Sequence, residues 1–436
     1  MTPPPELAQA SGLDEDLAQG STLSRRLVEA YFEQQDSAGR IFLHRASVMT
    51  ALHDSRLEPL LHKAICASGA LVIGDKDLES LSIRLSLEVE QSILSGLYHC
   101  TLPRLQALTV LLHLLRARSS REALWMLLSI ASRMAFTLRL NVEHANDSFC
   151  ERESNRRLMW SLYLLDSIIS AGVESLAVCP SSKIALRLPS NEYCFSLGME
   201  AKTGYLFTAS STSTDPDMGE LSYVVRLMSI RQDILRYARL SSGVRLVSAK
   251  QECSYTRRVA AGKVSIYDSR EELEGYSRSL CNYLSNLPRE LQPTAQNIAF
   301  RADSESFTCF VMLHTIWHQL QCDLYRLLVP RIREAVSRAA LLSVPAEFVA
   351  YCQKQCVHWI TKLLGFWSSV YHIPNRKRVL DCFFAVCAYQ ASQVIRQLKH
   401  LCNEGDTAER LHTQLAEMLE MLKEIEDAMP FVKPYV

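Results

Sequence analysis

The sequence predicts an all-α protein, a large array of packed helices with no significant sheet. Apolar side chains recur at three- and four-residue spacing over most of the 436 residues, as in helices that bury one face. The 15 glycines and 15 prolines fall mainly between these segments, where they begin or end helices. Runs that alternate apolar and polar residues, as half-buried strands do, are scarce.

Each predicted helix is an apolar stripe bounded by polar residues, proline or glycine. In chain order the stripes cover residues 22–36, 55–73, 76–99, 104–117, 121–140, 151–171, 220–241, 268–286, 303–330, 346–371, 376–400 and 407–428. The breaks between them include Pro103, Gly172, Pro180, Pro189, Pro288, Pro293, Pro345 and Pro374. Because proline lacks an amide hydrogen and glycine readily adopts the left-handed conformation of turns, these residues mark helix boundaries.

The helix over 151–171 carries the clearest local signals. Its stripe is formed by Leu158, Leu162, Leu165 and Ile169. Ser148 and Glu151 have the spacing of a capping box, and Glu153 also lies near the positive end of the helix dipole. Polar residues such as Asp166 interrupt the apolar run, which falls short of the about 20 residues that a membrane span needs. We therefore expect a helix buried on most sides.

The same pattern suggests a domain organisation. Residues 1–21, rich in proline and polar residues, are predicted to be a flexible lead-in. Residues 22–207 form a first helical domain, and 208–219 form a polar loop with too few apolar side chains to bury. Residues 220–436 are predicted to be a C-terminal helical region packed on the first domain.

Composition narrows the classes of function. Apolar residues make up 48% of the chain and charged residues 22%, as in ordinary globular proteins. Lysine plus arginine and aspartate plus glutamate each total 47, so no net positive charge attracts phosphates. The sequence therefore argues against autonomous DNA binding and against membrane association.

The 14 cysteines do not have the spacing of a metal site or of a secreted disulfide framework. The first is Cys66, no pair has CxxC spacing, and residues 1–20 lack a secretory signal. We expect buried free thiols in a reducing compartment, and no binuclear zinc cluster in this chain.

Two near-motifs raise other kinds of chemistry. In "GALVIGDK", Gly69 and Gly74 have the phosphate-loop spacing, but Asp75 stands where lysine is required and would repel phosphate. A candidate metal site is formed by His314, His318 and Cys322, which share one helix face at four-residue spacing. The apolar stripe beside them favours packed, metal-free side chains instead.

No catalytic residue is predicted. Asp166 could act as an acid whose pKa is raised by burial, but it has no identified partner carboxylate. A lone buried carboxylate more often caps backbone, pairs with an arginine or lines a small polar pocket.

Four stretches resemble the regulatory middle homology domain of fungal transcription factors, which normally follows a binuclear zinc cluster. They are "LVEAYFEQQDSAGRIFLHRASVMTAL", "EPLLHKAICASGALVIG", "LQALTVLLHLLRARSSREALWMLLSIASRMAFTLRLNVE" and "ERESNRRLMWSLYLLDSIISAG". The last is the most specific, and its family-motif core is Arg156, Arg157, Trp160, Tyr163 and Asp166. The family's later "LP" step matches Leu188 and Pro189, whereas Val173 and Glu174 replace its Gly-Arg-Pro step.

The resemblance implies an all-α regulatory domain in the nucleus that controls a specific metabolic or secondary-metabolite gene set without being an enzyme. It implies zinc only in a separate N-terminal cluster and DNA contact only through a missing or partner module. The implied partners are transcription machinery or regulator proteins, a small-molecule effector and a second copy in a homodimer.

Two alternatives remain open. The chain could be a small-molecule binding module, with a ligand held between the helices over 104–140 and 151–171. It could also be an enzyme of fungal secondary metabolism, although no acid, base and nucleophile constellation supports that hypothesis.

Overall fold

The computed structural model describes residues 17–33, 42–118, 120–207, 217–241, 270–304, 306–332, 335–336, 338–401 and 406–428. Residues 1–16 of the predicted lead-in and residues 208–216 of the predicted polar loop lie outside these residues. Within them the chain is all-α, with no strand or sheet, which confirms the predicted fold class.

Among its described residues, the first half of the chain contains eight α-helices and two 3-10 turns before residue 208. They are α2 (Thr22–Glu33), α3 (Arg45–His53), α4 (Pro59–Ile73), α5 (Lys76–Ser95), α6 (Leu102–Ala117), α7 (Arg121–Thr137), α8 (Phe149–Ser170), η1 (Glu174–Leu176), η2 (Ser181–Lys183) and α9 (Glu192–Leu197). The helix α10 (Glu220–Ser241) comes next among the described residues.

The second half is again helical. It comprises α12 (Arg270–Ser285), η3 (Arg289–Leu291), α13 (Ala295–Arg301), α14 (Phe307–Tyr325), η4 (Arg326–Leu328), α15 (Arg338–Leu342), α16 (Ala346–Tyr371), α17 (Cys382–Gln397), η5 (Lys399–Leu401) and α18 (Asp406–Ala428). Four helices, α3, α9, α13 and α15, were not predicted from the sequence because each is too short to show a full apolar stripe. The segment 376–381, predicted as helix, is not helical. Asp381 at its end caps α17 by accepting from the Phe383 amide at 2.8 Å.

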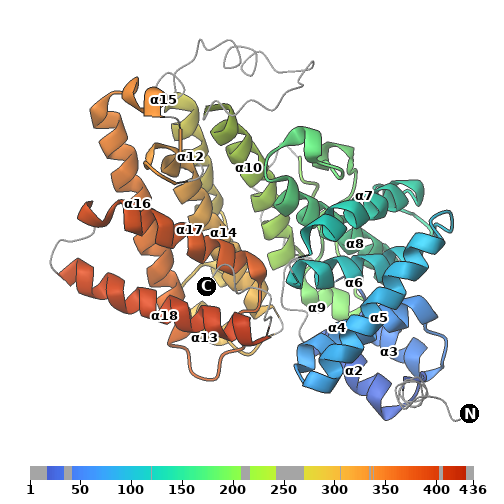
Figure 1. Ribbon diagram of the computed structural model, residues 1–436. Helices are drawn as coiled ribbons and strands as arrows, with labels where there is room; N and C mark the ends of the chain where they lie inside the picture. Colours follow the sequence, from blue (N-terminus) through green and yellow to red (C-terminus); the bar gives the residue numbers. More distant parts are fainter. Residues whose placement is uncertain are drawn as a thin grey trace, which may run out of the picture.

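Figure 1 shows two groups of helices with α10 between them, the first running from α2 to α9 and the second from α12 to α18. In the first group α4 packs against α2, α5 and α6. In the second group α14 packs against α10, α12 and α16, while α16 also packs against α18. One continuous hydrophobic core extends from Leu27 in α2 to Ile425 in α18.

Charged side chains also join the first group to the second and the second group to α10. Arg116 of α6 pairs with Asp381, the cap of α17, and both are largely buried. Arg301 of α13 pairs with Glu220 at the start of α10. Such cross-links fix the orientation of neighbouring helices, because a bidentate or buried charge pair tolerates little displacement.

The phosphate-loop near-motif has a packing role in the structure. Gly69 lies inside α4, where an added Cβ would come within 1.9 Å of the carbonyl oxygen of Leu27 in α2. Gly74 ends α4 with a left-handed φ of 72°. Because glycine has no side chain, Gly69 permits the close crossing of α4 and α2, and Gly74 permits the left-handed end of α4.

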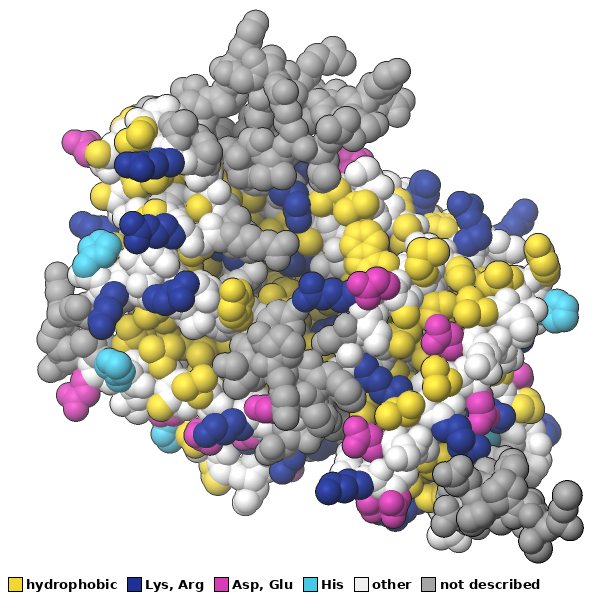
Figure 2. All heavy atoms as spheres, viewed as in Figure 1, with side chains coloured by type: hydrophobic (Ala, Val, Ile, Leu, Met, Phe, Trp, Pro, Cys, Tyr) yellow, Lys and Arg dark blue, Asp and Glu magenta, His cyan; other side chains and the backbone are white. Residues whose placement is uncertain are grey.

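The visible face in Figure 2 has lysine and arginine side chains interspersed with aspartate and glutamate. In the part of the chain that the structure describes, no helix is long and apolar enough to cross a bilayer.

Candidate functional site

The family-motif core lies on α8, whose start is fixed by its own sequence. Ser148 accepts a hydrogen bond from the Glu151 amide at 3.3 Å, and the Glu151 carboxylate accepts from the Ser148 amide at 3.0 Å. This reciprocal pair confirms the predicted capping box. The helix therefore begins at a defined residue, which sets the direction of every side chain that follows.

Glu153, Arg156 and Arg157 form a buried ionic cluster on the second and third turns of α8, and none of the three is more than 3% exposed. Glu153 accepts from Arg157 Nε at 2.9 Å and also pairs with Arg156. The sequence places Glu153 near the helix dipole, but the structure places it at the centre of this cluster. Its spacing of three and four residues from the two arginines was the signal for this pairing.

Each arginine has a second carboxylate from outside the helix. Arg156 donates from Nε and Nη2 to Glu143 at 3.0 and 3.1 Å. Arg157 donates from Nη1 to Glu192 at 2.7 Å, and its guanidinium lies 3.9 Å from the centre of the Phe195 ring. The cluster thus binds α8 to the loop before it and to α9 after it.

Opposing effects act on the pKa of Arg157. Burial alone would lower it, but the carboxylates of Glu192 and Glu153 outweigh burial, so the pKa of Arg157 is raised. The guanidinium therefore stays charged. Because every charge in the cluster faces an opposite charge, removing one member would leave its partners buried and less compensated.

The aromatic members of the family-motif core follow one turn later. Trp160 is fully buried and donates from Nε1 to the carbonyl of Arg187 at 2.9 Å. Tyr163 packs edge-to-face on Trp160, with ring centroids 5.5 Å apart. Burial raises the pKa of Tyr163 to about 12, so its hydroxyl remains protonated at neutral pH.

Asp166 caps backbone. Its carboxylate accepts from the amides of Val178 and Cys179, the latter at 2.9 Å. Burial raises the pKa of Asp166, although these two amides favour the charged form. Of the roles considered from the sequence, the structure therefore assigns Asp166 to backbone capping.

Together these side chains hold one stretch of chain, residues 177–192, which we call the return segment. Asp166 binds it at 178 and 179, Trp160 at 187, and the ionic cluster at 190 and 192. Ser190 contributes both its amide, to Glu153 at 2.8 Å, and its carbonyl, to Arg157 at 2.9 Å. The contacts run in reverse order along α8, so the return segment lies antiparallel to the helix.

The far end of α8 is capped by α10. The Ser167 carbonyl accepts from Arg231 at 3.0 Å and from Gln232 at 2.6 Å, and the Ala171 carbonyl accepts from Arg239 at 2.9 Å. Arginines suit this position because the last carbonyls of a helix carry partial negative charge and lack intrahelical donors. Gly172 has a left-handed φ of 83°, and a Cβ there would clash with α10.

The three metal-ligand candidates lie apart from this system, on α14. His314 Nε2 donates to the Leu291 carbonyl at 2.9 Å, and His318 Nδ1 donates to the His314 carbonyl at 2.8 Å. Cys322 is a buried free thiol. Among the described residues, no three His, Cys, Asp or Glu side chains are grouped so that they could hold a metal.

Burial lowers the pKa of His314 to about 3 and that of His318 to about 4. Both imidazoles are consequently neutral at pH 7. Each directs a donor to a backbone carbonyl, as buried polar side chains usually do.

A family model described as a fungal specific transcription factor domain matches residues 28–242, a range that includes α8, the return segment and the α10 cap. Residues 28–242 form a fungal transcription factor domain. The fungal transcription factor domain therefore contains the whole system of contacts around α8. Its match extends beyond residue 207, where the sequence suggested a boundary.

The relatives are regulators of transcription. The chain is 24% identical to the Zn(2)-C6 fungal-type transcription factor FTF1c of Fusarium oxysporum f. sp. lycopersici over 67% of this chain and 33% of that protein. It is 23% identical to an uncharacterized transcriptional regulatory protein of Schizosaccharomyces pombe over 46% of this chain and 21% of that protein. The chain spans about a third of the length of FTF1c. No solved structure matches it.

Proposed function

We propose that this chain is the regulatory part of a fungal transcription regulator that controls a specific metabolic or secondary-metabolite gene set from the nucleus. The observation that carries the proposal is the match of the fungal transcription factor domain to the segment organised around α8. The relatives named as transcription factors and regulatory proteins support it.

The contacts of the family-motif core favour a regulatory scaffold over an enzyme. The hydrogen bonds of Arg156, Arg157 and Asp166 are made with carboxylates and backbone groups of the same chain. A catalytic group must instead present a proton, a lone pair or a charge to a substrate in a cleft. We therefore propose that the domain acts by binding partners, such as transcription machinery or regulator proteins, and that a homodimer is one form of the regulator.

We further propose that a separate zinc-cluster module, in the same protein or in a partner, contacts the DNA. The formal net charge of this chain is zero, and basic and acidic side chains are interspersed on the face seen in Figure 2. Sequence-specific binding needs an element in a groove and a positive surface against the phosphates.

Selection from a pool of random DNA duplexes tests this division of labour. At physiological salt the chain alone should enrich no sequence, whereas a chimera with the zinc cluster of a relative at its N-terminus should enrich a defined motif. The isolated zinc cluster serves as the control. A tenfold preference by the chain alone, equivalent to about 1.4 kcal/mol, would contradict the proposal that another module reads the DNA.

A further inference from the structure

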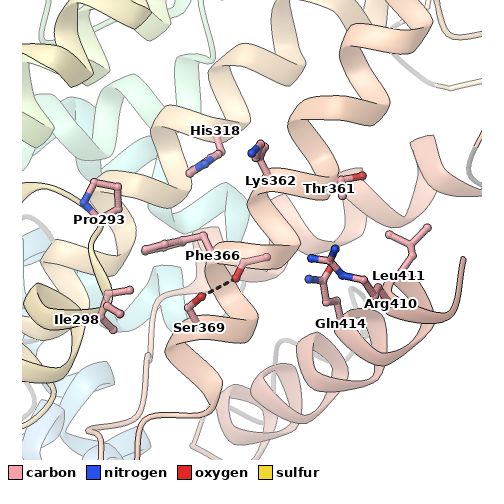
Figure 3. Close-up of a pocket in the computed structure, with 12 residues that line it drawn as sticks. Pro293, Ile298, His318, Thr361, Lys362, Phe366, Ser369, Arg410, Leu411 and Gln414 are labelled. Carbon is pink, nitrogen blue, oxygen red and sulfur yellow. Dashed lines mark hydrogen bonds between the residues drawn. The ribbon is translucent and has the colours of Figure 1, made fainter. Parts of the chain in front are cut away.

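A cavity of about 480 Å³ opens in the second half of the chain, between α13, α14, α16 and α18. This volume lies within the range of about 300–1,000 Å³ that small-molecule sites occupy. Figure 3 shows side chains from separate helices directed into it. The interface of α6 and α7 with α8, where the sequence suggested a ligand, is instead packed with buried side chains such as Leu108, Leu128 and Trp160.

The cavity wall has an apolar surface and a basic rim. The apolar part is made by Pro293, Ile298, Phe366 and Leu411. The exposed side chains of Lys362 on α16 and Arg410 on α18 lie at the rim. None of the described lining residues is acidic. The nearby acidic residues Glu409 and Glu417 line an adjoining hollow instead. An apolar molecule with a negative group fits this distribution.

His318 gives the wall a hydrogen-bond acceptor. Its Nδ1 hydrogen is committed to the His314 carbonyl, so Nε2 carries the lone pair of the neutral ring. The ring stacks on Phe366 with an interplanar angle of 21° and a centroid distance of 5.8 Å. Phe366 and His318 therefore give the cavity wall aromatic rings against which an aromatic ligand can pack.

We propose that this cavity binds an aromatic carboxylic acid that also carries a hydroxyl group. The carboxylate pairs with Lys362 and Arg410, the ring packs beside Phe366, and the hydroxyl donates to Nε2 of His318. This binding function goes beyond the proposed role in transcription. It is measured on the purified chain without DNA, so its failure would leave the regulatory proposal standing.

Gly365, on the cavity wall, offers a variant that blocks the site without removing a contact. An added Cβ there meets only the side-chain amide of Gln414, at 3.6 Å, which is an ordinary contact. Gly365→Leu therefore fills the cavity and also favours the helix, because leucine has a higher helix propensity than glycine. Gly275→Leu is the matched control, since nothing lies within 4 Å of a Cβ at that helical position.

Isothermal titration calorimetry with para-hydroxycinnamate tests the proposal. The wild-type chain and Gly275→Leu should bind it saturably, and Gly365→Leu should lose binding. Lys362→Gln and Arg410→Gln should each weaken binding about fivefold, as expected for an exposed ion pair of up to about 1 kcal/mol. The corresponding amide should bind the wild-type chain at least about fivefold more weakly than para-hydroxycinnamate does. Cinnamate, which lacks the hydroxyl, should show at least the same loss of affinity.

Three results would overturn the proposal. They are the absence of saturable binding to wild type, binding that Gly365→Leu leaves intact, and equal affinity for the acid and its amide. Circular dichroism and thermal melting of each variant confirm that it is folded before titration.

Discussion

Glu153→Gln should lower the free energy of unfolding by about 3–5 kcal/mol, the cost of removing one partner from a buried ion pair. The substitution keeps the shape of the side chain but removes the charge that faces Arg156 and Arg157. It also turns one carboxylate oxygen into an amide that donates toward groups that are themselves donors. Urea titration followed by circular dichroism measures the change.

The matched control is Glu151→Gln, the same substitution two residues earlier in α8. Glu151 is exposed, and glutamine can replace glutamate in a capping box. Its expected cost is below about 1 kcal/mol, in the range of an N-terminal capping contribution. If the two variants lost equal stability, the ionic cluster would not be a major source of stability.

Trp160→Ala should cost about 3–5 kcal/mol, because it opens a cavity in the core where the ring is completely buried. Trp125→Ala on α7 is the control. Trp125 is 39% exposed, so its truncation should cost much less. Trp160→Phe separates two effects, since it keeps most of the packing but leaves the Arg187 carbonyl without its donor.

The expected cost of Trp160→Phe is about 1–3 kcal/mol, the penalty of a buried group left without its hydrogen bond. Differential scanning calorimetry and urea titration measure the loss of stability in Trp160→Ala, Trp125→Ala and Trp160→Phe. A melting temperature of Trp160→Ala equal to that of wild type would contradict the central position of α8 in the core.

The sequence was sufficient to predict the helices with long apolar stripes and the start of α8. Both signals are local, because a stripe and a capping box depend on residues a few positions apart. The short helices α3 and α9 were missed for the same reason, since one or two turns hold too few apolar positions to show a period.

The partners of the family-motif core required the tertiary structure. Arg156 and Arg157 were recognisable as a motif, but Glu143, Glu192 and Ser190 reach them from other segments of the chain. The cavity was missed because four helices contribute to its wall. No spacing within one segment predicts which residues of distant helices will face each other.

We propose that this fungal transcription factor domain regulates transcription and that the contacts around α8 build the domain. A tethered reporter tests it most directly. The chain is fused to a bacterial DNA-binding protein in a fungal strain whose reporter gene carries the matching operator. Immunoblotting and chromatin immunoprecipitation establish equal abundance and operator occupancy.

The fusion should change reporter expression several-fold relative to the DNA-binding protein alone. Glu151→Gln should retain this change, and Glu153→Gln should lose it as the domain loses stability. Unchanged expression with the wild-type fusion, at equal abundance and operator occupancy, would contradict the claim that this chain regulates transcription.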